Sequence, residues 1–126
     1  MKRGSIKRNY KTATLKDVKA NPVVDAYIKK ADEHMAAIGY TEHGFRHASL
    51  TANIAHNIIE QLRLPERDAE LAAIAGYLHD VGNLIGRYDH GEGSALLVNS
   101  ILKDMEMDPL EIASIMGAIG NHEEEK

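Results

Sequence analysis

Residues 65–82 read PERDAELAAIAGYLHDVG, an alanine-rich run that ends in the dipeptide His79-Asp80. Proline is typical of the first turn of a helix, and glycine is typical of the residues just past a helix end. We therefore expect a helix from Pro65 to near His79, stopped before Gly82. One face of this helix carries small residues that let a second helix approach closely, namely Ala72, Ala75 and Gly76.

Helical signals continue on both sides of this run. Asn21-Pro22 and Asp108-Pro109 each combine a capping residue with a proline at the first helical position. No segment shows the sustained alternation of a β-strand. The sequence predicts an all-α fold, a compact bundle of about five helices, over residues 21–38, 45–62, 65–79, 94–104 and 109–120.

The composition is that of one globular domain. The chain has 126 residues, of which 44% are hydrophobic and 27% are charged. It has no cysteine, which excludes disulfides and thiolate metal sites. No apolar run approaches the roughly 20 residues of a membrane helix, and the N-terminus lacks the apolar stretch of a signal peptide. We expect a cytoplasmic protein with no membrane partner.

Residues 1–20 form a basic N-terminal arm. They carry seven Lys and Arg residues against Asp17 alone, which gives a net charge of +6. Because the whole chain has a net charge of −4, the remaining residues have a net charge of −10. Basic arms can contact nucleic acid, but Tyr10 is the arm's only aromatic residue, and a solvated terminus is the commoner outcome. We expect a solvated arm followed by a helical domain over residues 21–126, without a nucleic-acid partner.

Helical angles single out His47. Ile54 and Ile58 fall within about 20° of it, and Leu50 and Leu62 within about 60°, which predicts that His47 points into the bundle. His122 continues the inward face of Ile115 and Ile119, and His90 opens the helical region near residue 94 among glycines. Each histidine taken alone is as well explained as an ordinary core or loop residue. Together with a carboxylate, however, imidazoles suit divalent metals.

The chain resembles the HD-domain superfamily of metal-dependent phosphohydrolases over residues 21–122. The resemblance rests on the order of four histidines and an aspartate: His47, His79-Asp80, His90 and His122. It implies one or two divalent metal ions (Fe, Mn, Co, Zn or Mg), the first held by His47, His79 and Asp80. His90 and His122 would hold the second ion, with Asp80 bridging the two. A metal-bound hydroxide would then attack the phosphorus of a small phosphorylated substrate, a nucleotide or another phosphoester.

Two departures from the family pattern bear on this expectation. The common His-Asp-x-Gly-Lys motif ends here in Asn83, which leaves Arg46 and Arg87 as the nearest basic candidates to contact phosphate. The family also supplies a final Asp from a later helix, and no such residue precedes Lys126. We therefore expect the C-terminal part of the family domain to be absent, and activity to be weak.

The same departure predicts an exposed apolar surface. A bundle that stops near residue 122 would leave part of its core uncovered, and a second copy of the chain would cover it, giving a homo-oligomer. The residues expected in this surface are Ile112, Ile115, Met116 and Ile119. Two other functions stay open beside the phosphohydrolase: a di-iron HD-domain oxygenase, and a non-catalytic HD module for ligand sensing or assembly.

Overall fold

The computed structural model describes residues 9–40, 44–84 and 90–120, and these residues form helices with no β-strand. The elements are α1 (Leu15–Lys19), α2 (Pro22–Ala37), α3 (Phe45–Gln61), α4 (Glu66–Leu78), the 3₁₀-helix η2 (Val81–Leu84), α5 (His90–Asp104) and α6 (Pro109–Gly120). The all-α prediction is confirmed, and each of the five expected helices is present. The fourth begins earlier than expected, at His90. Within the described ranges, no helix is both long enough and apolar enough to cross a membrane.

Local capping explains where two of these helices begin. The Asn21 side chain accepts hydrogen bonds from the N–H groups of Val23 (2.8 Å) and Val24 (3.3 Å), at the start of α2. Asp108 plays the same part before α6, where its carboxylate accepts from the Leu110 N–H at 2.8 Å. Both helices then open with proline, as the sequence predicts.

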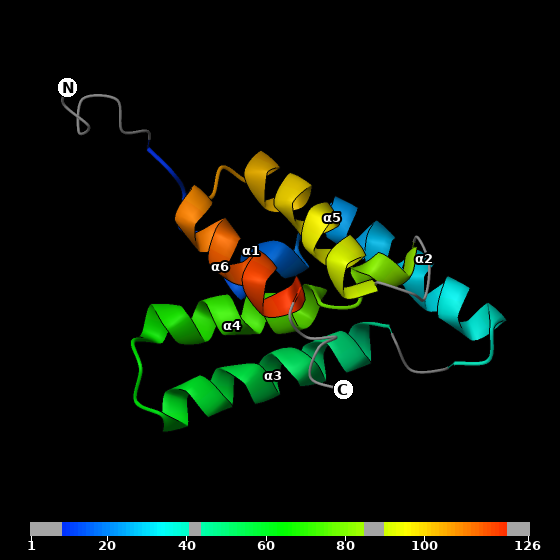
Figure 1. The fold of residues 1–126 in the computed structure, drawn as a ribbon, viewed down its shortest axis with the longest axis horizontal. Helices are drawn as coiled ribbons and strands as arrows, with labels where there is room; N and C mark the ends of the chain where they lie inside the picture. Colours follow the sequence, from blue (N-terminus) through cyan, green and yellow to red (C-terminus); the bar gives the residue numbers. More distant parts are fainter. Residues whose placement is uncertain (1–8, 41–43, 85–89, 121–126) are drawn as a thin grey trace.

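Helix α4 is the centre of the bundle (Figure 1). It packs against α3 on one side and against α6 and α1 on the other, while α5 packs on α6 and η2, and η2 also contacts α2. The core between them is apolar and includes the fully buried side chains of Met35, Ile74, Leu78, Val98, Leu102, Ile115 and Ile119. This arrangement brings the end of α4, the beginning of α3 and η2 to the same region.

Part of the basic arm packs on the domain, which the sequence does not predict. Val18 of α1 is fully buried, and the Leu15 N–H donates to the Glu70 carboxylate of α4. The Lys19 ammonium lies 5.6 Å from the centre of the Tyr77 ring. The expected solvated terminus is therefore wrong for α1. Two apolar residues, Leu15 and Val18, in a short, mostly charged helix were too weak a pattern to reveal it.

The apolar face of α6 is covered, contrary to the expectation of an exposed surface there. Ile112, Ile115 and Ile119 are only 4%, 1% and 1% exposed, and Met116 is partly buried. The reason is that α6 lies against both α4 and α5. Among the described residues, a continuous row of exposed apolar side chains lies on α3 instead.

Candidate metal centre

Three of the predicted ligands converge where α3 begins and α4 ends. His47 lies in the first turn of α3, His79 caps the C-terminus of α4, and Asp80 follows it directly before η2. The Oδ2 atom of Asp80 lies 3.3 Å from His47 Nε2 and 3.2 Å from His79 Nε2. The two imidazole rings are 5.4 Å apart between their centres. The structure therefore brings these three side chains together, and their binding of one metal ion stays a prediction.

The cluster is partly buried and opens on one side. The side chains of His79 and Asp80 are 12% and 14% exposed, whereas that of His47 is 33% exposed. A cavity of about 10 Å³ lies beside them, close to the space that one water molecule needs. Its wall is completed by Ile28, Ala31, Ala48, Tyr77 and Val81. An ion at this position would be reached from the His47 side.

His79 is held by the backbone of its own helix. Its Nδ1 lies 2.7 Å from the Gly76 carbonyl oxygen, so with a proton on Nδ1 it donates to that oxygen and directs Nε2 at Asp80. Burial alone lowers the pKa of His79, but the hydrogen bond and charge of Asp80, with the Gly76 carbonyl, raise it further than burial lowers it. The net pKa lies above the ordinary 6.5. The same carboxylate that favours a proton on this ring also favours a cation beside it.

The donor set and its spacing fit a divalent metal ion. Two imidazole nitrogens and a carboxylate oxygen lie within 4.8 Å of one another. Ligand atoms about 2.1 Å from one cation are about 3.0 Å apart at a right angle and about 3.4 Å apart at a tetrahedral angle. The two separations of 3.2 Å and 3.3 Å lie between these values. The separations between Asp80 and each imidazole therefore suit ligands of one ion.

Close packing of α3 on α4 brings the ligands together. A Cβ atom on Gly76 would lie 2.9 Å from the Thr51 carbonyl oxygen, so only glycine allows this approach. Ala48 and Ala52 of α3 are buried at the same interface. The sequence prediction that small residues on α4 admit a second helix is confirmed for Gly76, and that helix carries His47.

The predicted orientation of α3 is wrong, although His47 reaches the cluster. Ile54 and Ile58, the residues nearest His47 in helical angle, are 51% and 52% exposed. The buried Ala48 and Ala52 lie about 100° and 140° around the helix from His47. His47 contacts Asp80 from the edge of the helix interface, which explains why it keeps one third of its side chain exposed.

The other predicted site residues are only partly described. His90 is the first residue of α5, but its side chain lies outside the described part of the structure, as do the whole of Arg87 and His122. The second metal position therefore stays a prediction. Arg46 is exposed on α3, next to His47 in the sequence. Asn83 is 2% exposed and does not line the cavity beside the cluster, so it is not placed to contact a substrate phosphate there.

The sequence did not predict a buried contact that positions the segment directly after Asp80. Ser94 of α5 is fully buried, and its hydroxyl accepts a hydrogen bond from the Gly82 N–H at 2.6 Å. Gly93 lies at the same contact, where an added Cβ atom would lie 3.6 Å from the Gly82 Cα, an ordinary contact distance. This contact holds η2 against α5 directly after Asp80. The run of glycines around Ser94 was the available signal.

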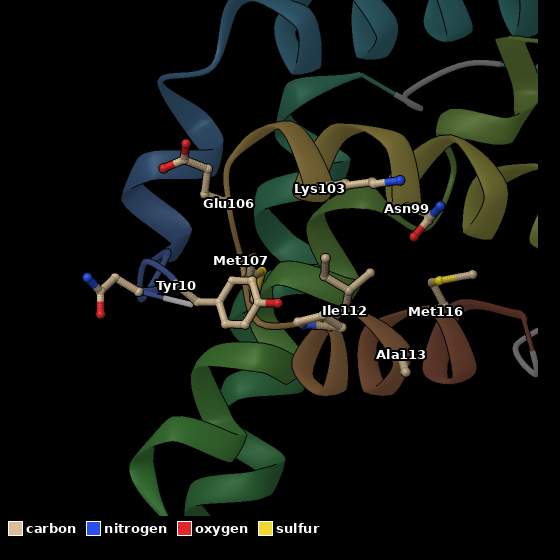
Figure 2. Close-up of a pocket in the computed structure, with 10 residues that line it drawn as sticks. Tyr10, Asn99, Lys103, Glu106, Met107, Ile112, Ala113 and Met116 are labelled. Atoms are coloured by element: carbon tan, nitrogen blue, oxygen red, sulfur yellow. The ribbon is translucent and has the colours of Figure 1, made fainter. Parts of the chain in front are cut away.

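Two other features of the described residues lie away from this cluster. A cavity of about 480 Å³ lies between the segment around Tyr10 and the helices α5 and α6, and none of the predicted metal ligands lines it (Figure 2). His56 lies between two carboxylates, with Nε2 3.2 Å from Glu66 and Nδ1 3.8 Å from Glu60. Because the carboxylates face different ring nitrogens, this group is better described as a surface ion pair than as a metal site.

Comparison with known protein families gives one match. The family model described as HD domain matches residues 44–126, which include α3 to α6 and all three residues of the cluster. Comparisons with curated proteins and with solved structures give no match.

Proposed function

We propose that this chain, which belongs to the HD-domain family, is a metal-dependent phosphohydrolase acting on a nucleotide or another small phosphoester. The observation that carries the proposal is the meeting of His47, His79 and Asp80 within 4.8 Å of one another. Two neutral donors and one carboxylate are ordinary ligands of the divalent metals used in hydrolysis. The cluster is also open on one side, which a substrate requires.

The residues of the cluster have separate parts in this function. His47 and His79 would hold the cation through Nε2, and Asp80 through Oδ2, the atoms that already face one another. A bound divalent cation supplies a lowered pKa for water and charge stabilisation for phosphoryl oxygens. Gly76 keeps the His79 ring in orientation through its carbonyl oxygen. Asp80, as a carboxylate, has two oxygens and so can serve a second cation.

Arg46 is the proposed contact for the substrate's phosphate among the described residues. It lies next to His47 in the first turn of α3 and is exposed, so it adds positive charge near the cluster. Arg87, His90 and His122 complete the proposal as a second phosphate contact and a second metal position. Since only three ligands come together among the described residues, we expect turnover to be slow.

The test measures metal and turnover on the same protein. The chain is purified, its metal content is determined by elemental analysis, and hydrolysis of nucleotides and simple phosphoesters is assayed with added Mn²⁺, Fe²⁺, Co²⁺, Zn²⁺ or Mg²⁺. We expect bound metal and slow phosphate release, both lost in His79→Ala and Asp80→Ala. His34→Ala, which removes an exposed histidine on α2, is the matched control and should retain both.

Two outcomes would replace this function with another. Bound iron with oxygen consumption and no phosphate release would select the di-iron oxygenase. Bound metal without turnover of either kind would select a non-catalytic module for ligand sensing or assembly. Absence of metal binding under all conditions would contradict the first two functions together.

A further inference from the structure

Helix α3 presents a row of large apolar side chains to solvent. Leu50, Ile54 and Ile58 of α3 and Leu62, which caps its C-terminus, follow one another at intervals of four residues, and they are 56%, 51%, 52% and 63% exposed. Side chains four positions apart lie one above another on a helix, so the four form a continuous ridge. Single exposed apolar residues are normal in proteins, but a ridge of this length marks an interaction surface.

The packing of the domain does not account for this ridge. Among the described elements, α3 packs extensively on α4 alone, and it does so through the small residues Ala48 and Ala52. Figure 1 shows α3 at the edge of the bundle, with α4 beside it. The other strongly exposed leucines, Leu96 and Leu110, lie apart from one another on α5 and α6. The ridge is therefore a separate feature of α3.

The order of residues in the ridge matches a second copy of the same chain. The residue types along the ridge are Leu, Ile, Ile and Leu at positions 50, 54, 58 and 62, an order that is the same in either direction. In an antiparallel pair related by a two-fold axis, Leu50 would meet Leu62 of the second copy and Ile54 would meet its Ile58. Rows of this four-residue spacing pack into one another in the commonest class of helix pair. Antiparallel helices also have favourably opposed dipoles.

The residues flanking the ridge and the exposed area of the ridge also suit a second copy of the chain. The side chains flanking the middle of the ridge on α3 include Thr51, Asn57 and Gln61, which are uncharged. Arg46 lies one turn before Leu50, and in an antiparallel pair the two Arg46 side chains lie at opposite ends, so two copies meet without like-charge repulsion. The exposed fractions of the four residues add to somewhat more than two whole side chains, roughly 400 Å² per copy. Two copies with their polar flanks reach about 1,000 Å², the lower end of specific interfaces.

We propose that two copies of this chain associate through an antiparallel pairing of their α3 helices, centred between Ile54 and Ile58. The small area gives a reversible dimer with a dissociation constant in about the micromolar range. His47 lies one turn before Leu50, so the end of the second copy's α3 would lie beside the open side of the candidate metal centre. The proposal does not depend on the phosphohydrolase function.

Sedimentation across a range of protein concentrations tests the association. The wild-type chain should change from its monomer mass of 13.9 kDa to twice that value as the concentration rises from about 1 μM to about 1 mM. Ile54→Glu and Ile58→Glu should remain monomeric throughout with unchanged helix content and melting temperature, because the substituted side chains are already half exposed. Leu96→Glu and Leu110→Glu, at more exposed but isolated positions, are matched controls that should dimerise like the wild type.

Cross-linking tests the antiparallel arrangement, since the chain has no cysteine of its own. A mixture of Leu50→Cys and Leu62→Cys chains should form mixed disulfides faster than either variant forms a disulfide with itself. Preferential self-linking of Leu50→Cys would contradict the antiparallel pairing. A monomer at every concentration, or dimers that survive both Ile54→Glu and Ile58→Glu, would overturn the proposal.

Discussion

Replacing Gly76 by alanine should separate α3 from α4 and weaken the candidate metal centre. The added Cβ would lie 2.9 Å from the Thr51 carbonyl oxygen, 3.1 Å from its carbonyl carbon and 3.2 Å from the Ala52 Cα. All three atoms belong to the backbone of α3, so no side-chain rotation relieves the contact. Ordinary contacts of a Cβ begin at 3.4 Å, and the helices must therefore move apart by about half an ångström.

The free energy of unfolding should fall by up to about 2 kcal/mol. Overpacking a close interface costs about 1–3 kcal/mol, while alanine in place of glycine within a helix returns about 1 kcal/mol. Gly117→Ala is the matched control, because Gly117 is exposed within α6 and an added Cβ there meets no atom within 4 Å. It should be stabilised by about 1 kcal/mol, so the two variants should differ by roughly 4 °C in melting temperature for each kcal/mol between them.

Urea unfolding and thermal melting with and without Zn²⁺ or Mn²⁺ measure both effects. Saturating metal should raise the melting temperature of the wild type and Gly117→Ala by similar amounts, and that of Gly76→Ala by less, because His47 and His79 lie on the two separated helices. A Gly76→Ala variant as stable as Gly117→Ala, with an undiminished metal response, would refute the argument.

Three further predictions follow from individual contacts. Glu111→Gln should destabilise the fold by about 1–2 kcal/mol at neutral pH, because the Arg67 guanidinium loses its charged partner at 2.8–2.9 Å. That hydrogen bond lowers the pKa of Glu111, so the stability that the Arg67–Glu111 pair contributes is complete above pH about 4.5 and is lost as the pH falls through the folded-state pKa. Urea titrations should therefore give the wild type and Glu111→Gln similar free energies of unfolding in acid. Ser94→Ala should cost about 1–3 kcal/mol in unfolding experiments, because the buried Gly82 N–H loses its acceptor. Asp80→Ala should remove both metals by elemental analysis and His122→Ala only one, and two metals retained in His122→Ala would contradict the second position.

Features encoded by neighbouring residues were predictable from the sequence. The helix starts at Asn21-Pro22 and Asp108-Pro109 depend on caps and prolines that act within one turn. The association of His79 with Asp80 is equally local, since both lie at one helix end. That His47 joins them could be predicted from its place in the order of histidines, although the reason offered for its inward direction was wrong.

Features that depend on packing were not predictable in the same way. The strongest apolar pattern on α3 faces solvent, because a helix interface is decided by how closely backbones approach and not only by side-chain hydrophobicity. The burial of Val18 depends on contacts of α1 with α4, which are distant in sequence. The support that Ser94 gives to Gly82 is likewise a contact between separate elements.

One packing choice links the candidate metal centre to the apolar ridge. With Ala48 and Ala52 against Gly76, α3 can lie close to α4, and His47 comes within 3.3 Å of Asp80. Large side chains at that interface would hold the helices further apart, since the distance between packed helices depends on the residues between them. An α3 that turns its small residues inward must turn its large ones elsewhere. The same rotation that assembles the metal ligands therefore leaves Leu50, Ile54, Ile58 and Leu62 outside, where a second copy can cover them.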